Sequence, residues 1–155
     1  MKIKWTDLIL LVVGTELVGV LSALISGGGF SGFYQQLEKP PLAPPGWLFP
    51  VVWSILYALM GISAYLILNN GDKRRRTALM LYGAQLLVNF LWTPVFFGLR
   101  SLEGATAVVI AMLIFITAMM LSFYRISKAA AYLNIPYLLW TGFAAYLTIG
   151  VLVLK

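Results

Sequence analysis

The chain has 155 residues, of which 61% are hydrophobic and 10% are charged, with a mean hydropathy of +0.92 and a net charge of +6. A soluble domain is about 45–50% apolar and about 25% charged, so this composition excludes a water-soluble globule. The sequence has no Cys and no His, which excludes disulfides, thiolate or imidazole metal sites and catalysis by a histidine base. We therefore expect neither a metal nor a cofactor.

Five apolar runs follow one another along the chain, and each is long enough to cross a bilayer as a helix of about 20 residues. The runs cover residues 6–26, 47–68, 77–99, 104–124 and 133–154. Lipid cannot hydrogen-bond a bare backbone, and no alternating pattern suggests a barrel, so these runs predict helices. The expected fold class is an all-α integral membrane protein, a five-transmembrane-helix bundle. It would form a single membrane domain over residues 1–155, with a proline-containing lid loop at 27–46.

Positive charge predicts which way the five spans point. The first end, the second loop and the fourth loop of such a bundle lie on one side, and they hold eight of the eleven cations. These eight are Lys2, Lys4, Lys73, Arg74, Arg75, Arg76, Arg125 and Lys128. The positive-inside rule then predicts a cytoplasmic N-terminus. We interpret the run 73–76 as this topology signal, which also meets anionic lipid, and we expect no nucleic acid as a partner.

Glu16 lies in the middle of the first span, where a carboxylate costs about 3 kcal/mol on insertion scales. It is therefore a functional candidate, and a membrane-embedded Glu in a first helix resembles small multidrug exporters that exchange protons for cations. The alternative is a structural Glu that is protonated or bonded to a neighbouring helix. This alternative is favoured, because a proton relay would need a second embedded acid or base and the sequence offers none. Thr15, Gly19 and Ala23, spaced four residues apart, predict close packing of another helix.

The third span carries Gln85 and Asn89 at i and i+4, with Trp92 three residues further, so that all three side chains share one face. This face should look into the bundle, because unpaired amides in lipid are costly. The amides have two possible roles. They form interhelical hydrogen bonds, each of which stabilises the bundle by under about 1 kcal/mol, or they supply polar groups that bind a ligand in a pocket.

Aromatic residues gather on the second and fifth spans. Trp53 and Tyr57 are at i and i+4, while Tyr137, Trp140 and Phe143 follow at successive i+3 steps. A Trp near the headgroups usually anchors a helix at the membrane surface. Trp53 and Trp140 lie about two turns inside their spans, so the anchoring explanation is weaker for them.

Three segments of this sequence resemble one known family. They are Lys39-Pro40-Pro41-x-x-Pro44-Pro45-x-Trp47 continuing to Pro50-Val51-x-Trp53-x-x-x-Tyr57, then Tyr82-x-x-Gln85-Leu86-x-x-Asn89-x-x-Trp92-x-Pro94-x-Phe96-Phe97-Gly98, and Pro136-Tyr137-x-x-Trp140-x-x-Phe143-Ala144. On these motifs the chain resembles a bacterial member of the TspO/MBR family, the tryptophan-rich sensory and translocator proteins, or peripheral-type benzodiazepine receptors.

This resemblance implies a five-helix bundle, often a homodimer, with a pocket under the first loop. The pocket would bind porphyrins such as protoporphyrin IX, benzodiazepine-type drugs and, in animal members, cholesterol. The ligand-binding residues that the resemblance implies for this chain are Tyr34, Pro44, Trp53, Asn89, Trp92, Trp140 and Ala144, and the aromatic spacing adds Tyr57 and Phe143. Some bacterial members are associated with light- and oxygen-dependent breakdown of protoporphyrin, which is attributed to tryptophans. The resemblance therefore makes Trp53 and Trp140 the candidate catalytic residues.

The sequence departs from the family pattern in places. Leu42 stands where a Trp is usual, and Thr148 stands where an Asn is expected. The animal family's C-terminal sterol motif needs a cation within about five residues after a Tyr, whereas only Lys155 follows Tyr146.

Three functions stay open at this point. The first is a membrane receptor or carrier in a bacterial cell membrane, which binds a porphyrin or another planar apolar molecule. The second is an enzyme that degrades porphyrin in the light, which only the resemblance supports. The third is a proton-coupled exporter of small molecules that uses Glu16.

Overall fold

The computed structural model describes residues 3–25, 36–45 and 47–154. Across these ranges it contains no strand. Its helices are α1 (Trp5–Ile25), α3 (Leu48–Leu68), α4 (Arg75–Thr93), the π-helix η1 (Pro94–Gly98), α5 (Leu102–Tyr124), α6 (Lys128–Tyr132) and α7 (Ile135–Leu154). Within the described ranges five stretches are long and apolar enough to cross a membrane, with α4 continuing into η1 and α6 into α7. The predicted all-α, five-span bundle is confirmed.

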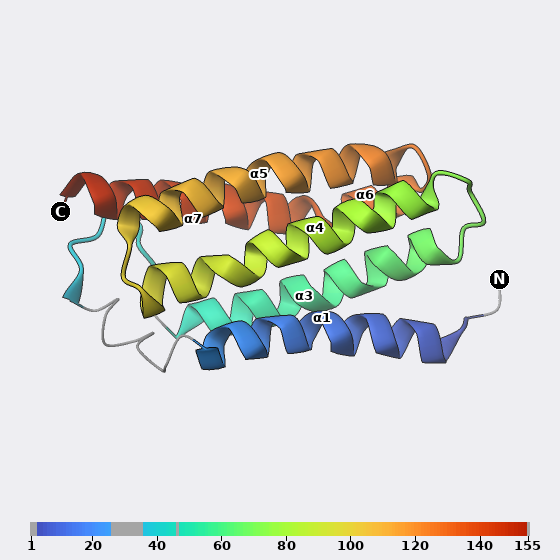
Figure 1. The fold of residues 1–155 in the computed structure, drawn as a ribbon, viewed down its shortest axis with the longest axis horizontal. Coiled ribbons are helices and arrows are strands. Elements are labelled where there is room, and N and C mark those ends of the chain that lie inside the picture. Colours follow the sequence, from blue (N-terminus) through green and yellow to red (C-terminus); the bar gives the residue numbers. More distant parts are fainter. Residues whose placement is uncertain (1–2, 26–35, 46, 155) are drawn as a thin grey trace.

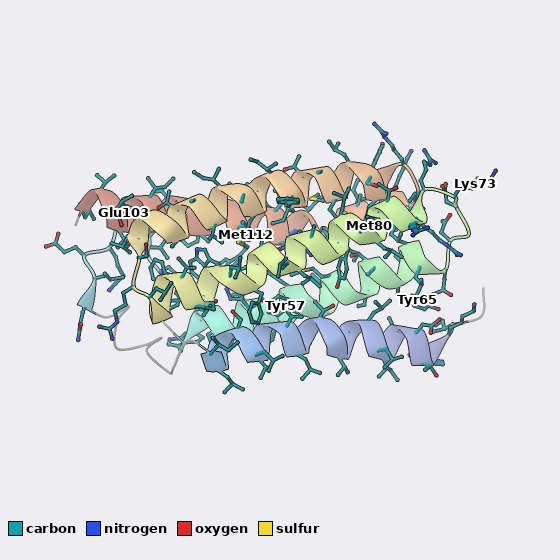
Figure 2. All side chains as sticks on the ribbon, viewed as in Figure 1. Tyr57, Tyr65, Lys73, Met80, Glu103 and Met112 are labelled. Carbon is teal, nitrogen blue, oxygen red and sulfur yellow. The ribbon has the colours of Figure 1, made fainter. Side chains whose placement is uncertain are left out.

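The long helices lie side by side along one axis (Figure 1). Helix α1 packs against α3 and α4, α4 packs against α5, and α5 packs against α7. Lys73, between α3 and α4, and Glu103, in the first turn of α5, lie at opposite ends of the bundle (Figure 2). The first turn of α1 and the last turn of α7 likewise lie at opposite ends (Figure 1). This alternation is what an odd number of spans requires.

The buried side chains of helix α1 are polar. Thr15 and Ser22 are its buried residues. The hydroxyls of Thr15 and Tyr82 are hydrogen-bonded to each other, and Ser22 Oγ donates to the carbonyl oxygen of Phe90 at 2.7 Å. Lipid tails are as apolar as the side chains themselves, so the hydrophobic effect does not drive helices together in a membrane. Close packing of small residues and interhelical hydrogen bonds stabilise such helix contacts instead.

Helices α3 and α7 meet through large aromatic rings. Phe49 and Trp140 form an edge-on pair with ring centroids 5.8 Å apart. Trp53 and Tyr137 form a second edge-on pair at 6.1 Å. Edge-to-face pairs at these separations suit the aromatic quadrupole.

The third span ends in the π-helix η1, which begins at Pro94. Proline has no N–H to donate, and the widened turn is closed by the Leu99 N–H, which donates to the Pro94 carbonyl at 2.8 Å. The π-helix brings Phe96 and Phe97 into the core, where both contact Trp92, at ring-centroid distances of 5.1 and 5.8 Å. All three rings are buried.

Helical structure before the fifth span starts earlier than the predicted residue 133. Helix α6 begins at Lys128 because the Ser127 side chain caps it, accepting a hydrogen bond from the Ala130 N–H at 3.3 Å. Asn134 is fully buried at the bend before α7, and its amide donates to Ser63 Oγ and to the Ala130 carbonyl, both at 3.0 Å. These bonds allow a polar residue inside the bundle.

The basic end of the bundle is held by Arg74. Its guanidinium forms a salt bridge with Asp72 at 2.9 Å and donates to the Arg125 carbonyl at 2.8 Å, which joins the α3–α4 and α5–α6 connections. Hydrogen bonds from Arg74 lower the pKa of Asp72 to about 2. Asp72 therefore keeps its charge at any physiological pH.

The described part of the predicted lid loop is docked on the C-terminal half of α7. Pro40 to Ala43 form a tight turn in which the Ala43 N–H donates to the Pro40 carbonyl at 3.3 Å and Leu42 has a positive φ of 72°. The Tyr146 hydroxyl donates to the Pro41 carbonyl at 2.7 Å. A Cβ on Gly150 would lie 2.5 Å from Pro40 Cγ, so only glycine permits this contact. Residues 26–35 of the loop lie outside the described part of the chain.

Candidate ligand site

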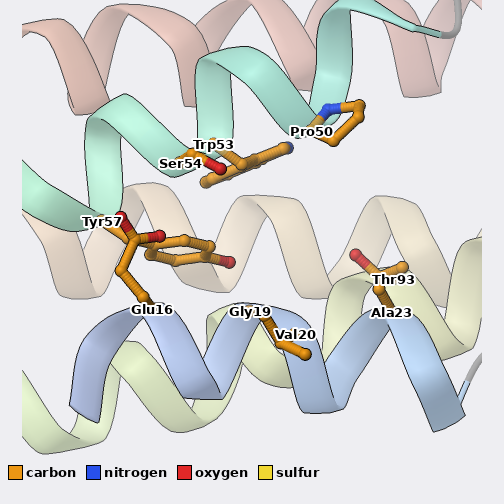
Figure 3. Close-up of a pocket in the computed structure, with 9 residues that line it drawn as sticks. All are labelled: Glu16, Gly19, Val20, Ala23, Pro50, Trp53, Ser54, Tyr57 and Thr93. Carbon is orange, nitrogen blue, oxygen red and sulfur yellow. The ribbon is translucent and has the colours of Figure 1, made fainter. Parts of the chain in front are cut away.

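A cavity of about 340 Å³ lies between α1 and α3, with one residue of α4 at its edge (Figure 3). We call it the α1/α3 cavity. Its lining residues are Glu16, Gly19, Val20, Ala23, Pro50, Trp53, Ser54, Tyr57 and Thr93. Pockets for small molecules usually measure about 300–1,000 Å³ and combine apolar and aromatic walls with few polar groups. The cavity has this character at the small end of that range.

Two stacked rings of α3 form the aromatic wall. Trp53 and Tyr57 are one helical turn apart, and their ring centroids are 5.6 Å apart with an angle of 27° between the planes. Trp53 is half-buried, whereas Tyr57 is 7% exposed. Stacked rings of this kind offer a flat ligand an apolar surface with little conformational freedom to lose.

Glycines let α1 approach this wall closely. A Cβ on Gly19 would lie 2.2 Å from Tyr57 Cε2, and a Cβ on Gly61 would lie 2.6 Å from the Val12 Cα atom. Both contacts join α1 to α3. The close packing predicted from the small-residue pattern is therefore confirmed at Gly19, while Ala23 is exposed and lines the cavity.

A buried hydrogen-bond chain fixes the Tyr57 ring from behind. The Tyr57 hydroxyl donates to Asn89 Oδ1 at 2.8 Å, and the Asn89 amide donates to the Tyr137 hydroxyl at 2.7 Å. Tyr137 in turn donates to Gln85 Oε1 at 2.6 Å, and the Gln85 amide contacts Met60 Sδ at 3.8 Å. Gln85 and Asn89 face the bundle interior, as predicted. Their amides join α3, α4 and α7, so their observed bonds are those of interhelical contacts.

Glu16 is the acid of the α1/α3 cavity. Its carboxyl group lies beside Tyr57 (Figure 3), and the side chain is half-buried. Within the described ranges, no hydrogen bond or ion pair reaches this carboxyl group. An intramembrane acid that faces a cavity without a partner is a functional candidate.

Trp140 lies on the other side of α3. With Phe143 it lines a second hollow of about 410 Å³ between α3 and α7, together with Val52, Ile55, Leu56, Pro136 and Leu139. In the described part of the chain, Trp53 and Trp140 therefore line two different hollows. Their separation follows from helix packing, because Trp53 turns towards Tyr137 and α1 while Trp140 turns towards Phe49.

The other described residues implied by the family motifs do not line the α1/α3 cavity. Trp92 and Ala144 are buried in the core, and among the described residues the Trp92 Nε1 atom has no hydrogen-bond partner. Pro44 is half-buried in the loop segment before α3. Tyr34 lies outside the described residues.

Sequence reasoning did not select Pro50, Ser54, Val20 or Thr93, which line the α1/α3 cavity. A signal for the first two was present, because residues 50, 53, 54 and 57 follow the i, i+3, i+4, i+7 spacing of one helix face. Nothing in the sequence marks Val20 or Thr93, since they reach the cavity only through the packing of α1 and α4 against α3.

Comparison with known proteins identifies the family of this chain. Residues 9–154 match the model of the TspO/MBR family. The chain is 37% identical to the tryptophan-rich protein TspO of Chlorobaculum tepidum over 89% of each chain. It is 42% identical to the tryptophan-rich sensory protein of Cereibacter sphaeroides, over 70% of this chain and 67% of that protein. It is 33% identical to the translocator protein of Bos taurus, over 92% of this chain and 86% of that protein. The chain therefore belongs to the TspO/MBR family.

Proposed function

We propose that this integral membrane protein is a receptor or carrier that binds planar apolar ligands, of porphyrin or benzodiazepine type, in the α1/α3 cavity. The observation that carries the proposal is the stacked wall of Trp53 and Tyr57 along a cavity of about 340 Å³. Stacking on such a wall contributes about 0.5–1.5 kcal/mol beyond simple burial of the rings. Membership of a family that includes the translocator protein of Bos taurus supports a role in binding or moving ligands at a membrane.

The cavity size favours one ligand type over the other. A benzodiazepine-sized molecule matches about 340 Å³ more closely than a porphyrin does. Val20, Ala23, Pro50 and Ser54 are exposed, so the cavity opens on the side of the bundle. A porphyrin macrocycle would extend through this opening into the surrounding lipid.

A titration of purified protein with protoporphyrin IX and with a benzodiazepine-type ligand tests this proposal. Both ligands should quench the tryptophan emission in a saturable way, and Trp53→Phe should weaken binding about threefold to tenfold, which corresponds to about 0.7–1.4 kcal/mol. Trp5→Phe is the matched control, because Trp5 is the first residue of α1, is 62% exposed and does not line the cavity. Equal affinities of the two variants would exclude Trp53 as a ligand contact.

We also propose light-dependent degradation of porphyrin as an activity of this protein. The same titration repeated under light, followed by porphyrin absorbance, tests it. Trp53 and Trp140 are the candidate catalytic residues, since indole is easily oxidised and phenylalanine is not. Trp53→Phe combined with Trp140→Phe should abolish the light-dependent loss of porphyrin absorbance, while dark binding falls only modestly. Loss at the parent rate in the double variant would mean that the porphyrin destroys itself as a photosensitiser.

A proton-coupled exporter that uses Glu16 is the second candidate function. The observation in its favour is the position of Glu16 on the cavity wall. This function predicts a pH-dependent flux of small molecules from loaded vesicles that Glu16→Gln abolishes. An unchanged flux would remove the exporter and leave the receptor or carrier.

We further propose that the protein lies in a bacterial cell membrane as a homodimer, with its N-terminus in the cytoplasm. The cation distribution supports this orientation. Gly83 supports the dimer, since it lies on an exposed face of α4 with Met80 and Leu87, and a Cβ added to it would meet nothing within 4 Å. A small residue on an open helix face suits the close approach of a second helix.

A further inference from the structure

The charge pattern of the α1/α3 cavity is one-sided. Among its lining residues Glu16 is the acid, Ser54 and Thr93 add hydroxyl groups, and no Lys or Arg contributes. The Tyr57 hydroxyl is already committed to Asn89. The strongest polar feature that a ligand meets in this cavity is therefore a carboxyl group.

A carboxyl group at this position requires a partner. An ionised carboxylate away from bulk water is costly unless a cation and hydrogen-bond donors compensate it. The described residues supply Glu16 with neither a hydrogen bond nor an ion pair. A ligand that brings its own cationic donor would supply both.

The aromatic wall lies within reach of the same ligand. Figure 3 shows the Glu16 carboxyl group beside the Tyr57 ring, with Trp53 along the same wall. A ring stacked on Trp53 with a short alkyl arm directed towards Glu16 would use both features. The rings also favour the cation directly, because a cation is attracted to the face of an indole or a phenol.

We propose that Glu16 makes the α1/α3 cavity selective for aromatic ligands that carry a protonated amine, with the ammonium group on the carboxylate and the ring against Trp53 and Tyr57. This inference rests on the proposed function, namely that the cavity binds ligands at all. It adds that the preferred ligand is a cation. The Glu16 carboxylate repels a ligand carboxylate from the same position. A porphyrin would therefore enter with its carboxylates directed away from Glu16.

The route into the cavity fits such amphiphilic cations. The exposed lining residues Val20, Ala23, Pro50 and Ser54 open the cavity on the side of the helix pair, within the membrane-spanning part of α1 and α3. An aromatic amine partitions into the membrane with its ring among the lipid tails and its charge near the headgroups. It can therefore approach the cavity laterally, without crossing either end of the bundle.

A charge series on one ring system tests the inference. The probes are 2-(1-naphthyl)ethylamine, the neutral 2-(1-naphthyl)ethanol and the anionic 1-naphthylacetate, titrated calorimetrically into protein in nanodiscs, with empty nanodiscs subtracted. The parent protein should bind the amine about tenfold more tightly than the alcohol, a difference of about 1.4 kcal/mol. The acetate should bind most weakly.

Glu16→Gln should bring the affinities for amine and alcohol to within about twofold of each other, while the affinity for the alcohol stays near the parent value. Asp7→Asn is the matched control, because it removes one negative charge from the first turn of the same helix, away from the cavity. This control should keep the parent preference. Gel filtration and the unfolding temperature establish that each variant is folded.

The outcomes separate the two proposals. Equal binding of amine and alcohol by the parent overturns the role of Glu16 but leaves the cavity as a ligand site. A preference for the amine that persists in folded Glu16→Gln also overturns that role. Absence of binding by all three probes to the folded parent overturns both proposals. If Glu16→Gln does not fold, Glu16→Ala takes its place in the same series, with the same expected and contradicting results.

Discussion

The hydroxyl of Tyr57 on α3 donates a hydrogen bond to Oδ1 of Asn89 on α4 at 2.8 Å, and both residues are at least 93% buried. Because this bond uses the phenol proton, Tyr57 offers the cavity its ring rather than a hydrogen-bond donor. Asn89 does not itself line the α1/α3 cavity. The aromatic wall of the site is therefore positioned by an amide that lies behind it.

Asn89→Ala should destabilise the protein by about 1–3 kcal/mol, because it leaves the hydroxyls of Tyr57 and Tyr137 without their buried partner. Ligand affinity should fall as well, since the Tyr57 ring is no longer fixed. Thermal unfolding in detergent and ligand titration measure the two effects. Asn70→Ala, at an exposed position between α3 and α4, is the control. Equal behaviour of the two variants would show that the hydrogen-bond chain does not position the wall.

Gly19→Ala should damage the site directly. The new Cβ would lie 2.2 Å from Tyr57 Cε2, so either the ring or α1 must move. Overpacking of this kind costs about 1–3 kcal/mol, and we expect ligand affinity to fall about tenfold or more in the same titration. Gly14→Ala is the matched control on the same helix, because its Cβ would meet nothing within 4 Å. A harmless Gly19→Ala would mean that α1 does not approach Tyr57 so closely.

Reporter fusions test the orientation in the membrane. Eight of the eleven cations fall on the side of the N-terminus, so a reporter placed in the 73–76 segment should be active in the cytoplasm. A reporter fused after Lys155 should be active outside it. Activity of both reporters on the same side would break the five-span arrangement.

Gly83→Leu should lower the fraction of dimer trapped by chemical crosslinking in membranes. Leucine on this open face of α4 prevents a second helix from approaching closely. Ligand affinity should stay near the parent value, because Gly83 does not line the α1/α3 cavity. Gly142→Leu on α7 is the control, since a Cβ there also meets nothing within 4 Å. An unchanged dimer fraction in Gly83→Leu would assign the interface to another helix.

The sequence predicts the helical fold well because the bilayer leaves few choices. Runs of about 20 apolar residues in lipid must satisfy their backbone internally, which requires helices. The burial of Gln85 and Asn89 follows from the cost of exposing amides to lipid. The stacking of Trp53 on Tyr57 follows from their spacing of four residues along one helix.

The relative placement of Trp53 and Trp140 could not be predicted in this way. Helix α7 is apolar nearly all round, so its composition does not say which side faces α3. The rotation of α7 is decided by individual contacts, such as Phe49 against Trp140 and the buried hydroxyl of Tyr137. The π-helix that begins at Pro94 was likewise not predicted, and it places Phe96 against Trp92.

The central claim is that ligand binds between α1 and α3, and photo-crosslinking tests it most directly. A benzodiazepine-type ligand with a photoreactive group, irradiated on the protein in nanodiscs and mapped by peptide mass spectrometry, should label the α1/α3 cavity. We expect the label on residues 16–23 of α1 and 50–57 of α3, and an excess of unlabelled ligand should suppress it. A competable label confined to Leu139, Trp140 and Phe143, which line the α3/α7 hollow, would contradict the account.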